Sequence, residues 1–456
     1  MESYDGDDPA VEDALQVLFT AHVRIVWPGR AGGNGNQRDS AFVESRRVAG
    51  EVRIREVCLG MFPAPRSPRY ESLDAWRGVA CLAVVVFHSS LYVATRAHET
   101  RVIAQGGSAF DWAVVAAGRL WIGVPIFFAI SGYCIAASAD AARTRPGGVG
   151  RYFVRRARRI YPPLWVALTL GALFLVALPE GVRPGDTPDG VELVPAEFRP
   201  DPWQLAGNLT LTESWRPAVV GPKTSYVLGQ CWTLCYEEQF YLVVGLLLVL
   251  APRWFFPGVW LVTFLVVFNL SDLNPCPLRV AGTFTDGLWV AFAAGVAAYY
   301  RLNHAPPRLG AAIEGLLLAL GLGFLASDPE PLGAAQTLGK LNAAACAFAV
   351  LLCRLRPSDA ALASARWAAP LRFCGRMCYS LYLTHPLVAV PVAWACYRLG
   401  LVSPAATVLV TLPVCTLLSV GLGYAFYLAI EKRFLNTSPA PTPAEMAPAT
   451  SALRPA

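Results

Sequence analysis

Long apolar blocks follow one another along most of this sequence, and short charged connections separate them. About ten such blocks lie after residue 78, each close to the roughly 20 residues that a helix needs to cross a hydrocarbon core. Charged residues make up 15% of the chain, whereas soluble domains average about 25%. Because a backbone in lipid must satisfy its own hydrogen bonds, these blocks should be helical. The sequence therefore predicts an all-α polytopic membrane protein.

The distribution of arginine among the connections orients these blocks. We place them at roughly 78–96, 112–137, 162–178, 232–251, 254–271, 284–300, 309–326, 334–353, 377–397 and 404–430. The connection 138–161 contains seven arginines, and the connections after later even-numbered blocks are also basic. The connections after odd-numbered blocks are poorer in arginine or acidic. Since lysine and arginine collect in cytoplasmic loops, we predict about ten transmembrane helices with both termini in the cytoplasm.

The composition divides the chain into three parts. Residues 1–69 are a polar N-terminal extension without a signal-peptide pattern, and we predict that it is disordered or a misassigned start, with Met61 as the alternative start. Residues 70–435 form the membrane domain, in which about 179–231 is a long extracytoplasmic loop. Residues 436–456 are a Pro- and Ala-rich tail that we expect to be disordered, because it cannot bury a core.

The twelve cysteines do not indicate a metal site or a disulfide framework. Most of them lie within apolar blocks, where cysteine behaves as a small apolar residue. The pairs Cys231/Cys235 and Cys374/Cys378 have i, i+4 spacing, and no histidine stands at ligand spacing from them. We therefore expect no bound metal.

The first apolar block carries ionisable residues that a membrane helix seldom contains. It reads LDAWRGVACLAVVVFH from Leu73 to His88 and includes Asp74 and Arg77. Arg77 and His88 are eleven residues apart, close to three helical turns, so they share one face at a separation of roughly 16 Å. Arginine binds phosphate through its forked guanidinium, and histidine is a general base near neutral pH. The pair suits a phosphate-tailed donor that enters from the cytoplasm.

Both residues also have simpler explanations. Arg77 lies at the end of the block, from which arginine commonly extends to the membrane surface. A membrane histidine such as His88 often only forms a hydrogen bond with a neighbouring helix. The catalytic interpretation is favoured for His88 because Arg77 shares its face.

Two further blocks bring polar groups into the membrane. Ser131 and Gly132 lie in FFAISGY, where the small pair either packs against another helix or lets a ligand approach, with the Ser131 hydroxyl as a donor. The sequence CWTLCYEEQFY places Glu237 at the outer mouth of the fourth block. The aromatic residues around Glu237 fit an interfacial belt or a carbohydrate-binding mouth, and the residues alone do not separate these alternatives.

The remaining candidates come from RRARRIYPPLW and YSLYLTHP. Arg155 and Arg159 belong to the first run, which mainly orients the chain and can also attract an anionic donor. His385 precedes a proline, where a helix tends to kink, so it either lines a cavity or is packed. With Asp74, Ser131 and Gly132, these three residues complete the expected donor- or substrate-binding groups.

Seven motifs in order make the chain similar to the acyltransferase-3 family of integral membrane acyltransferases. They are SLDAWRGVACLAVVVFH, FFAISGY, RRARRIYPPLW, NLTL, WTLCYEEQFYL, YSLYLTHP and FYLAIEKRF, and they span about residues 70–435. The resemblance implies that Arg77 and His88 are the essential pair, and that Glu237 matches the glutamate before the family's Phe-Tyr pair. Departures such as Trp76 and Tyr133 remove no reacting group. We expect a stand-alone form without the SGNH hydrolase-like domain that some members carry.

The resemblance implies a membrane-bound O-acetyltransferase that takes an acyl group, acetyl above all, from cytoplasmic acyl-CoA (acetyl-CoA). The group would pass to a hydroxyl of a glycan, glycolipid or similar acceptor at the outer face of a bacterial inner membrane. His88 would deprotonate the acceptor or carry the acyl group, and Glu237 would position the acceptor or relay a proton. We expect membrane lipid but no nucleic acid as a partner. Two alternatives remain open: an acyl-group translocator that supplies a separate soluble transferase, and a proton-coupled transporter of a small polar solute.

Overall fold

A computed structural model of the protein describes residues 70–177, 201–271, 273–278, 280–328 and 337–435. The predictions for the N-terminal extension, for the C-terminal tail and for the first part of the long loop fall outside these ranges. Within them the regular structure is helical throughout, and no strand occurs. This agrees with the all-α prediction.

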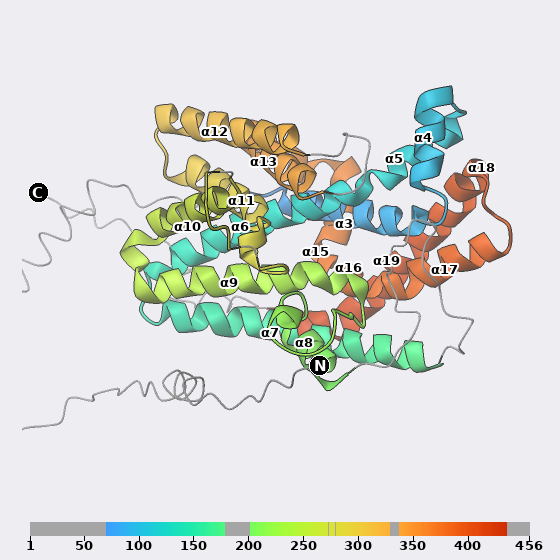
Figure 1. Cartoon of the computed structure of the whole chain (residues 1–456), viewed down its shortest axis with the longest axis horizontal. Coiled ribbons are helices and arrows are strands. Elements are labelled where there is room, and N and C mark those ends of the chain that lie inside the picture. The colour runs from blue at the N-terminus through green and yellow to red at the C-terminus, as the bar shows by residue number, and fades with distance from the viewer. Residues whose placement is uncertain (1–69, 178–200, 272, 279, 329–336, 436–456) are drawn as a thin grey trace, which may run out of the picture. The chain divides into compact units, whose positions relative to one another are not determined.

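The helices follow one another along the chain (Figure 1), and most of their connections are short. They are α3 (Leu73–Ser90), α4 (Arg96–Gln105), α5 (Ala109–Gly118), α6 (Gly123–Arg143), α7 (Gly148–Ala177), α8 (Pro202–Thr210), α9 (Trp232–Leu250), α10 (Phe255–Leu270), α11 (Trp289–Asn303), α12 (Pro307–Ala326), α13 (Leu338–Leu355), α14 (Asp359–Ser364), α15 (Ala369–Arg376), α16 (Cys378–Thr384), α17 (Pro386–Arg398), α18 (Pro404–Ala406) and α19 (Leu412–Ala429). Short 3-10 turns connect several of them, and the π-helical segment η8 (Thr407–Thr411) joins α18 to α19.

Seven helical segments in the described part of the chain are long and apolar enough to cross a membrane. They are Ala109–Arg143, Gly148–Ala177, Gly229–Leu250, Pro252–Leu270, Pro307–Ala326, Leu338–Ser364 and Pro404–Arg433. The other three expected spans correspond to α3, which carries Asp74 and Arg77, to the 15-residue α11, and to the interrupted pair α16–α17. The protein is a multi-pass membrane protein, while the count of ten and the cytoplasmic placement of the termini stay predictions.

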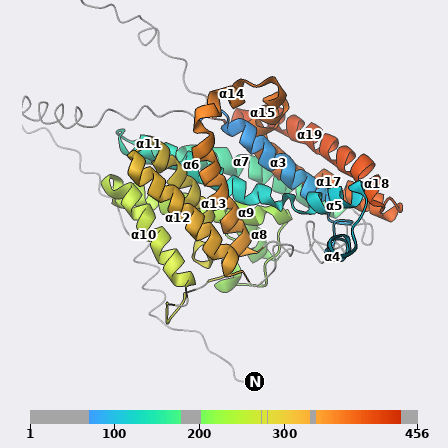
Figure 2. The ribbon, with the colours of Figure 1, turned by 90° about the horizontal axis from the view of Figure 1, so that it is seen from above.

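Close helix crossings at glycine hold the bundle together. A Cβ atom at Gly132 of α6 would collide with the Phe292 carbonyl of α11, and one at Gly295 of α11 would collide with the Ala129 carbonyl of α6. Glycine thus lets the two backbones touch, as is common in membrane helix packing. Gly78 similarly allows α3 to approach α15. As a result α3 lies alongside α15, and also packs against α6 and α19 (Figure 2).

Helix α16 ends at Thr384, and α17 begins at Pro386. Proline has no backbone N–H, so the carbonyl of Tyr382, four residues earlier, cannot receive the usual helical hydrogen bond. Two side chains donate hydrogen bonds to this carbonyl instead. His385 Nδ1 lies 2.8 Å and Gln230 Nε2 lies 3.3 Å from the Tyr382 oxygen. The helix is therefore interrupted at the proline, where we expected a kink, and other side chains bind the carbonyl that the interruption frees.

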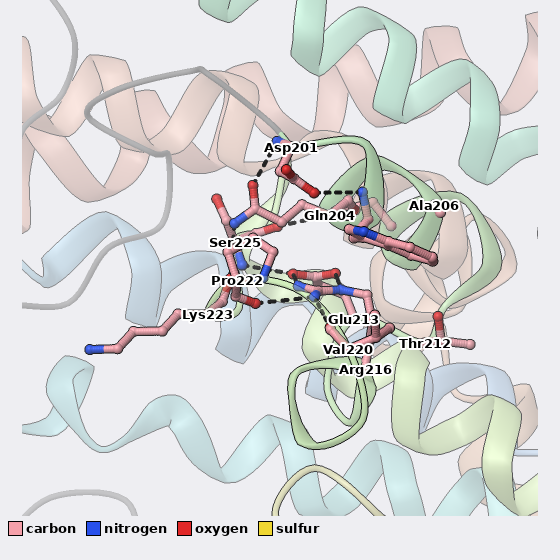
Figure 3. Close-up of polar contacts among 12 residues, drawn as sticks. Asp201, Gln204, Ala206, Thr212, Glu213, Arg216, Val220, Pro222, Lys223 and Ser225 are labelled. Atoms are coloured by element: carbon pink, nitrogen blue, oxygen red, sulfur yellow. Dashed lines mark hydrogen bonds and ion pairs between the residues drawn. The ribbon is translucent and has the colours of Figure 1, made fainter. Parts of the chain in front are cut away.

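The described part of the connection between α7 and α9 has a buried polar centre of its own (Figure 3). Arg216 and Glu213 are 3% and 0% exposed, and two N–H groups of the guanidinium donate to the carboxylate at 2.7 and 2.8 Å. Arg216 also donates to the carbonyls of Val220 and Pro222, while the backbone N–H of Ser225 donates to Glu213. The hydrogen bonds that Arg216 donates to the Glu213 carboxylate raise the pKa of Arg216 above its ordinary value, so the arginine stays charged.

Replacement of Arg216 by methionine is expected to destabilise the protein, because it leaves the Glu213 carboxylate buried without its partner. Breaking a buried pair in this way costs roughly 3–5 kcal/mol, which should appear as a lower midpoint of thermal unfolding in detergent. Lys223→Met is the matched control: it removes the same charge from the same connection, but Lys223 is exposed. Equal midpoints for the two variants would contradict this assignment.

Candidate active site

A cavity of about 190 Å³ lies between α3, α6, α7, α9 and α16. Five of the residues singled out from the sequence line it, and they come from several of these helices. They are Arg77, His88, Ser131, Arg159 and Glu237. The structure thus brings together side chains that are separated by up to 160 residues in the chain.

Arg77 and His88 both face this cavity from α3. One Arg77 N–H donates to Asp74 at 2.7 Å, and another points at the Cys134 sulfur of α6 at 3.0 Å. Asp74 stands one turn earlier in α3 and holds the Arg77 guanidinium through this hydrogen bond. It therefore affects the cavity through Arg77. The guanidinium keeps further donors for an anionic ligand, because arginine has five N–H groups.

His88 forms a pair with His385, which lies at the break between α16 and α17. The Nδ1 atom of His88 and the Nε2 atom of His385 are 2.8 Å apart. The two ring planes differ by only 2°, and the ring centres are 5.0 Å apart. Since the facing nitrogens are so much closer than the centres, the rings lie end to end, as an in-line N–H···N hydrogen bond requires. His385 is fully buried and does not line the cavity, so only His88 of this pair faces the cavity.

The hydrogen bonds around His385 determine where the protons of this pair lie. His385 Nδ1 is 2.8 Å from the Tyr382 carbonyl and 3.0 Å from the Leu381 carbonyl, and carbonyl oxygens only accept. Nδ1 therefore carries the proton, and in a neutral imidazole Nε2 is then an acceptor. His88 must accordingly donate from its own Nδ1. This leaves the lone pair of His88 on Nε2, which is the form that a general base needs.

Glu237 belongs to a second polar group on the cavity wall. The Ser131 hydroxyl of α6 and the Tyr241 hydroxyl both donate to the same Glu237 oxygen, and the two hydroxyl oxygens are 3.5 Å apart. The neighbouring Glu238 points elsewhere and accepts a hydrogen bond from Tyr161 of α7 at 3.0 Å. Glu237 thus lies in the second turn of α9 and lines the cavity, and its position at the outer mouth stays a prediction.

Two arginines of α7 reach the cavity, and one expected arginine does not. Arg156 and Arg159 line it, with Arg156 stacked 5.1 Å above the ring centre of Tyr241. Arg155 is exposed and does not line the cavity. Gly132 is likewise absent from the cavity lining, because its missing side chain serves the contact with α11. For Gly132 the geometry matches the packing alternative, with Ser131 alone facing the cavity.

Comparison with known proteins shows the family of the chain. Residues 70–428 match the family model described as an acyltransferase domain. The chain belongs to the acyltransferase-3 family. This confirms the resemblance that the seven motifs indicated, and it makes the protein an acyltransferase.

Two curated relatives support this membership. The acyltransferase is 26% identical over 326 residues to the exopolysaccharide production protein ExoZ of Rhizobium meliloti, which covers 69% of this chain and 89% of ExoZ. It is 24% identical over 197 residues to the peptidoglycan O-acetyltransferase OatA of Listeria monocytogenes, covering 41% of this chain. The matched segment spans only 26% of OatA. No solved structure matches the chain.

The cavity of this acyltransferase contains residues that the sequence reasoning missed. Besides Arg156 they are Gln230, Thr233, Cys134, Cys378, Tyr379 and Tyr382. For Arg156 a signal existed: it stands four residues from both Tyr152 and Ile160, and these two are buried, so helical periodicity places it on the inner face. For Gln230 no comparable signal existed, since it lies in the 3-10 turn η3 (Gly229–Cys231) just before α9.

The described residues contain no group of three or more His, Cys, Asp or Glu side chains that could hold a metal ion.

Proposed function

We propose that this acyltransferase moves an acetyl group from acetyl-CoA, bound from the cytoplasmic side, to a hydroxyl of a glycan or glycolipid at the outer face of a bacterial inner membrane. One observation carries the proposal: a single cavity presents arginines together with a histidine whose free nitrogen is set by a second histidine. The names of the two relatives, peptidoglycan O-acetyltransferase for OatA and exopolysaccharide production protein for ExoZ, support the choice of an acetyl group and a glycan.

Three guanidinium groups would bind the donor. Arg77, Arg156 and Arg159 line the cavity from α3 and α7. The phosphates of CoA are separated from its thioester by the pantetheine arm, and Arg77 is separated from His88 by three turns, roughly 16 Å along the helix. Phosphates held at Arg77 therefore leave the thioester free to lie near His88. Forked hydrogen bonds from arginine suit phosphate better than a point charge does.

His88 would act as the general base for the acceptor. Its Nε2 takes the proton of the acceptor hydroxyl as the oxygen attacks the thioester carbonyl. The bond between the acyl carbon and the sulfur then breaks, and the CoA thiolate leaves with the proton that His88 received. The hydrogen bond between His88 Nδ1 and His385 stabilises the imidazolium that forms between these two steps. Ser131, Glu237 and Tyr241 would orient the acceptor on the opposite wall.

Loss of the gene is expected to lower the ester-linked acetate that mild alkali releases from the surface glycans of the producing cell. Reintroduction of the wild-type gene should restore it, and a His88→Ala gene should not. Unchanged glycan acetate after deletion would contradict the proposed function. Restored acetate that depends on a second, soluble protein would instead favour an acyl-group translocator.

Replacing His385 with leucine is expected to lower kcat by about 100-fold, a typical share of general-base catalysis. The leucine cannot accept from His88 Nδ1, so the histidine loses the partner that sets its free nitrogen. His385→Gln should recover most of the rate, because the amide oxygen of glutamine can accept from His88. The measurement is the release of free CoA thiol by purified protein. Equal rates for the leucine and glutamine variants would contradict the role of the pair.

A further inference from the structure

Gln230 is a buried cavity residue with one end of its amide bound and the other without a hydrogen-bond partner among the described residues. It is 3% exposed and lines the cavity in the turn η3, just before α9. Its Nε2 donates to the carbonyls of Tyr382 and Leu383 at 3.3 and 3.2 Å. These carbonyls lie at the break before Pro386, so the break supplies the acceptors for the amide.

The same contacts fix the orientation of the amide. A flipped amide would place Oε1 against the two carbonyl oxygens, so Oε1 must take the other position. In that position Oε1 is buried and has no hydrogen-bond partner among the described residues. A buried acceptor left without a donor carries a desolvation cost, which a bound hydroxyl would remove. The geometry therefore leaves an acceptor site that only an incoming O–H or N–H group, or water, can fill.

The neighbouring polar groups do not compete for this site. The Tyr382 hydroxyl donates to the Gln230 backbone carbonyl, and the Thr233 hydroxyl is 2.9 Å from the Tyr382 hydroxyl. Trp232 also lines the cavity, so the same cavity presents an aromatic ring and a polar amide. An aromatic ring and a hydrogen-bond acceptor in one cavity suit a sugar, which combines apolar C–H faces with hydroxyl donors.

The site is adjacent to the proposed base. Gln230 Nε2 and His385 Nδ1 donate to one and the same oxygen, the Tyr382 carbonyl, and His385 in turn holds His88. We propose that Gln230 Oε1 accepts a hydrogen bond from a second hydroxyl of the acceptor, next to the hydroxyl that is acylated. This inference rests on the proposed function and defines the acceptor class: a polyhydroxylated sugar with neighbouring free hydroxyls.

The test uses purified protein in liposomes, acetyl-CoA, methyl β-glucoside and its four monodeoxy analogues. We expect the wild type to acetylate the parent glycoside with a kcat/KM about 10- to 100-fold above that for one deoxy analogue, because a site built for a hydroxyl rejects a ligand without it. In Gln230→Met that ratio should fall to about one, while the KM for acetyl-CoA stays within about twofold.

Gln239→Met is the matched control, because Gln239 is a glutamine of α9 with both amide ends bound: Nε2 to the Cys235 and Gly282 carbonyls, and Oε1 to the Phe284 N–H. It should keep the wild-type ratio. A ratio unchanged in Gln230→Met, or lost equally in both variants, overturns the proposal and leaves a water-filled or merely structural amide. Loss of acetyl from CoA without transfer to any glycoside overturns the acceptor class alone, and no loss from CoA at all overturns the proposed function.

Discussion

Replacing His88 with alanine is expected to lower kcat for acyl transfer by about 1,000-fold, within the range that a general base contributes. Of the ring nitrogens of His88 and His385, only Nε2 of His88 has a free lone pair on the cavity side, and the variant removes it. His385 cannot substitute, since it is fully buried and its Nδ1 is committed to the carbonyls of α16. The measurement is the rate at which purified protein releases free CoA thiol in the presence of the acceptor.

His98→Ala provides the control for this variant, since His98 lies in α4 and outside the cavity lining. It should retain the wild-type rate. The His88→Ala protein should still bind acetyl-CoA and elute as a folded species in detergent, because Arg77 remains in place. Transfer at the wild-type rate by a folded His88→Ala protein would remove His88 from the chemistry.

Replacing Arg77 with alanine is expected to raise the KM for acetyl-CoA by about 100-fold. A hydrogen bond to a charged group contributes about 1.5–3 kcal/mol, and Arg77 offers a forked pair to phosphate. Arg77→Lys keeps the charge but not the fork, so its KM should lie between those of the wild type and the alanine variant. Equilibrium binding of acetyl-CoA to the purified variants measures the same loss without turnover.

The control for Arg77 is Arg151→Ala, which removes the same charge from an exposed position of α7. Its KM should stay within about twofold of the wild-type value. If Arg151→Ala raised the KM as much as Arg77→Ala did, the effect would reflect the net charge of this face rather than a donor site. In that case the proposed contact between Arg77 and phosphate would be wrong.

The sequence could indicate which helix carries the proposed catalytic pair because the pattern is local. Arg77 and His88 stand three turns apart on one helix, and the structure places both on the wall of one cavity. The pairing of His88 with His385 could not be predicted in the same way, since 297 residues separate them. Even the proline after His385 indicated only a kink. Which side chains would donate to the Tyr382 carbonyl, which the proline frees, depends on how α9 and α16 pack.

Helical phase explains why the arginines of α7 that line the cavity differ from those that the sequence suggested. The run of arginines suggested Arg155 and Arg159, but adjacent helical residues point about 100° apart, so Arg156 faces the cavity while Arg155 is exposed. Gly132 shows a different limit. A glycine beside a polar residue serves ligand approach or helix packing equally well in sequence, and only the position of α11 decides between them.

Two of the expected spans, α3 and the pair α16–α17, are not among the seven helical segments that are long and apolar enough to cross a membrane, and the reason is physical. The helix α3 combines an apolar stretch with Asp74, Arg77 and His88, so the residues that build the site are those that make it less apolar. The pair α16–α17 is interrupted at His385, again at a site residue. The polar groups of the candidate site therefore weaken the hydropathy signal at the helices that carry them.

The most direct test of the account follows the fate of an acetyl label. Purified wild-type protein in liposomes, with no other protein present, receives acetyl-CoA labelled on the acetyl group together with a glycan acceptor. The account predicts that the protein binds acetyl-CoA, releases free CoA and forms an alkali-labile labelled ester on the glycan. Absence of acetyl-CoA binding by the wild type, with the label remaining on CoA, would contradict the account at its centre.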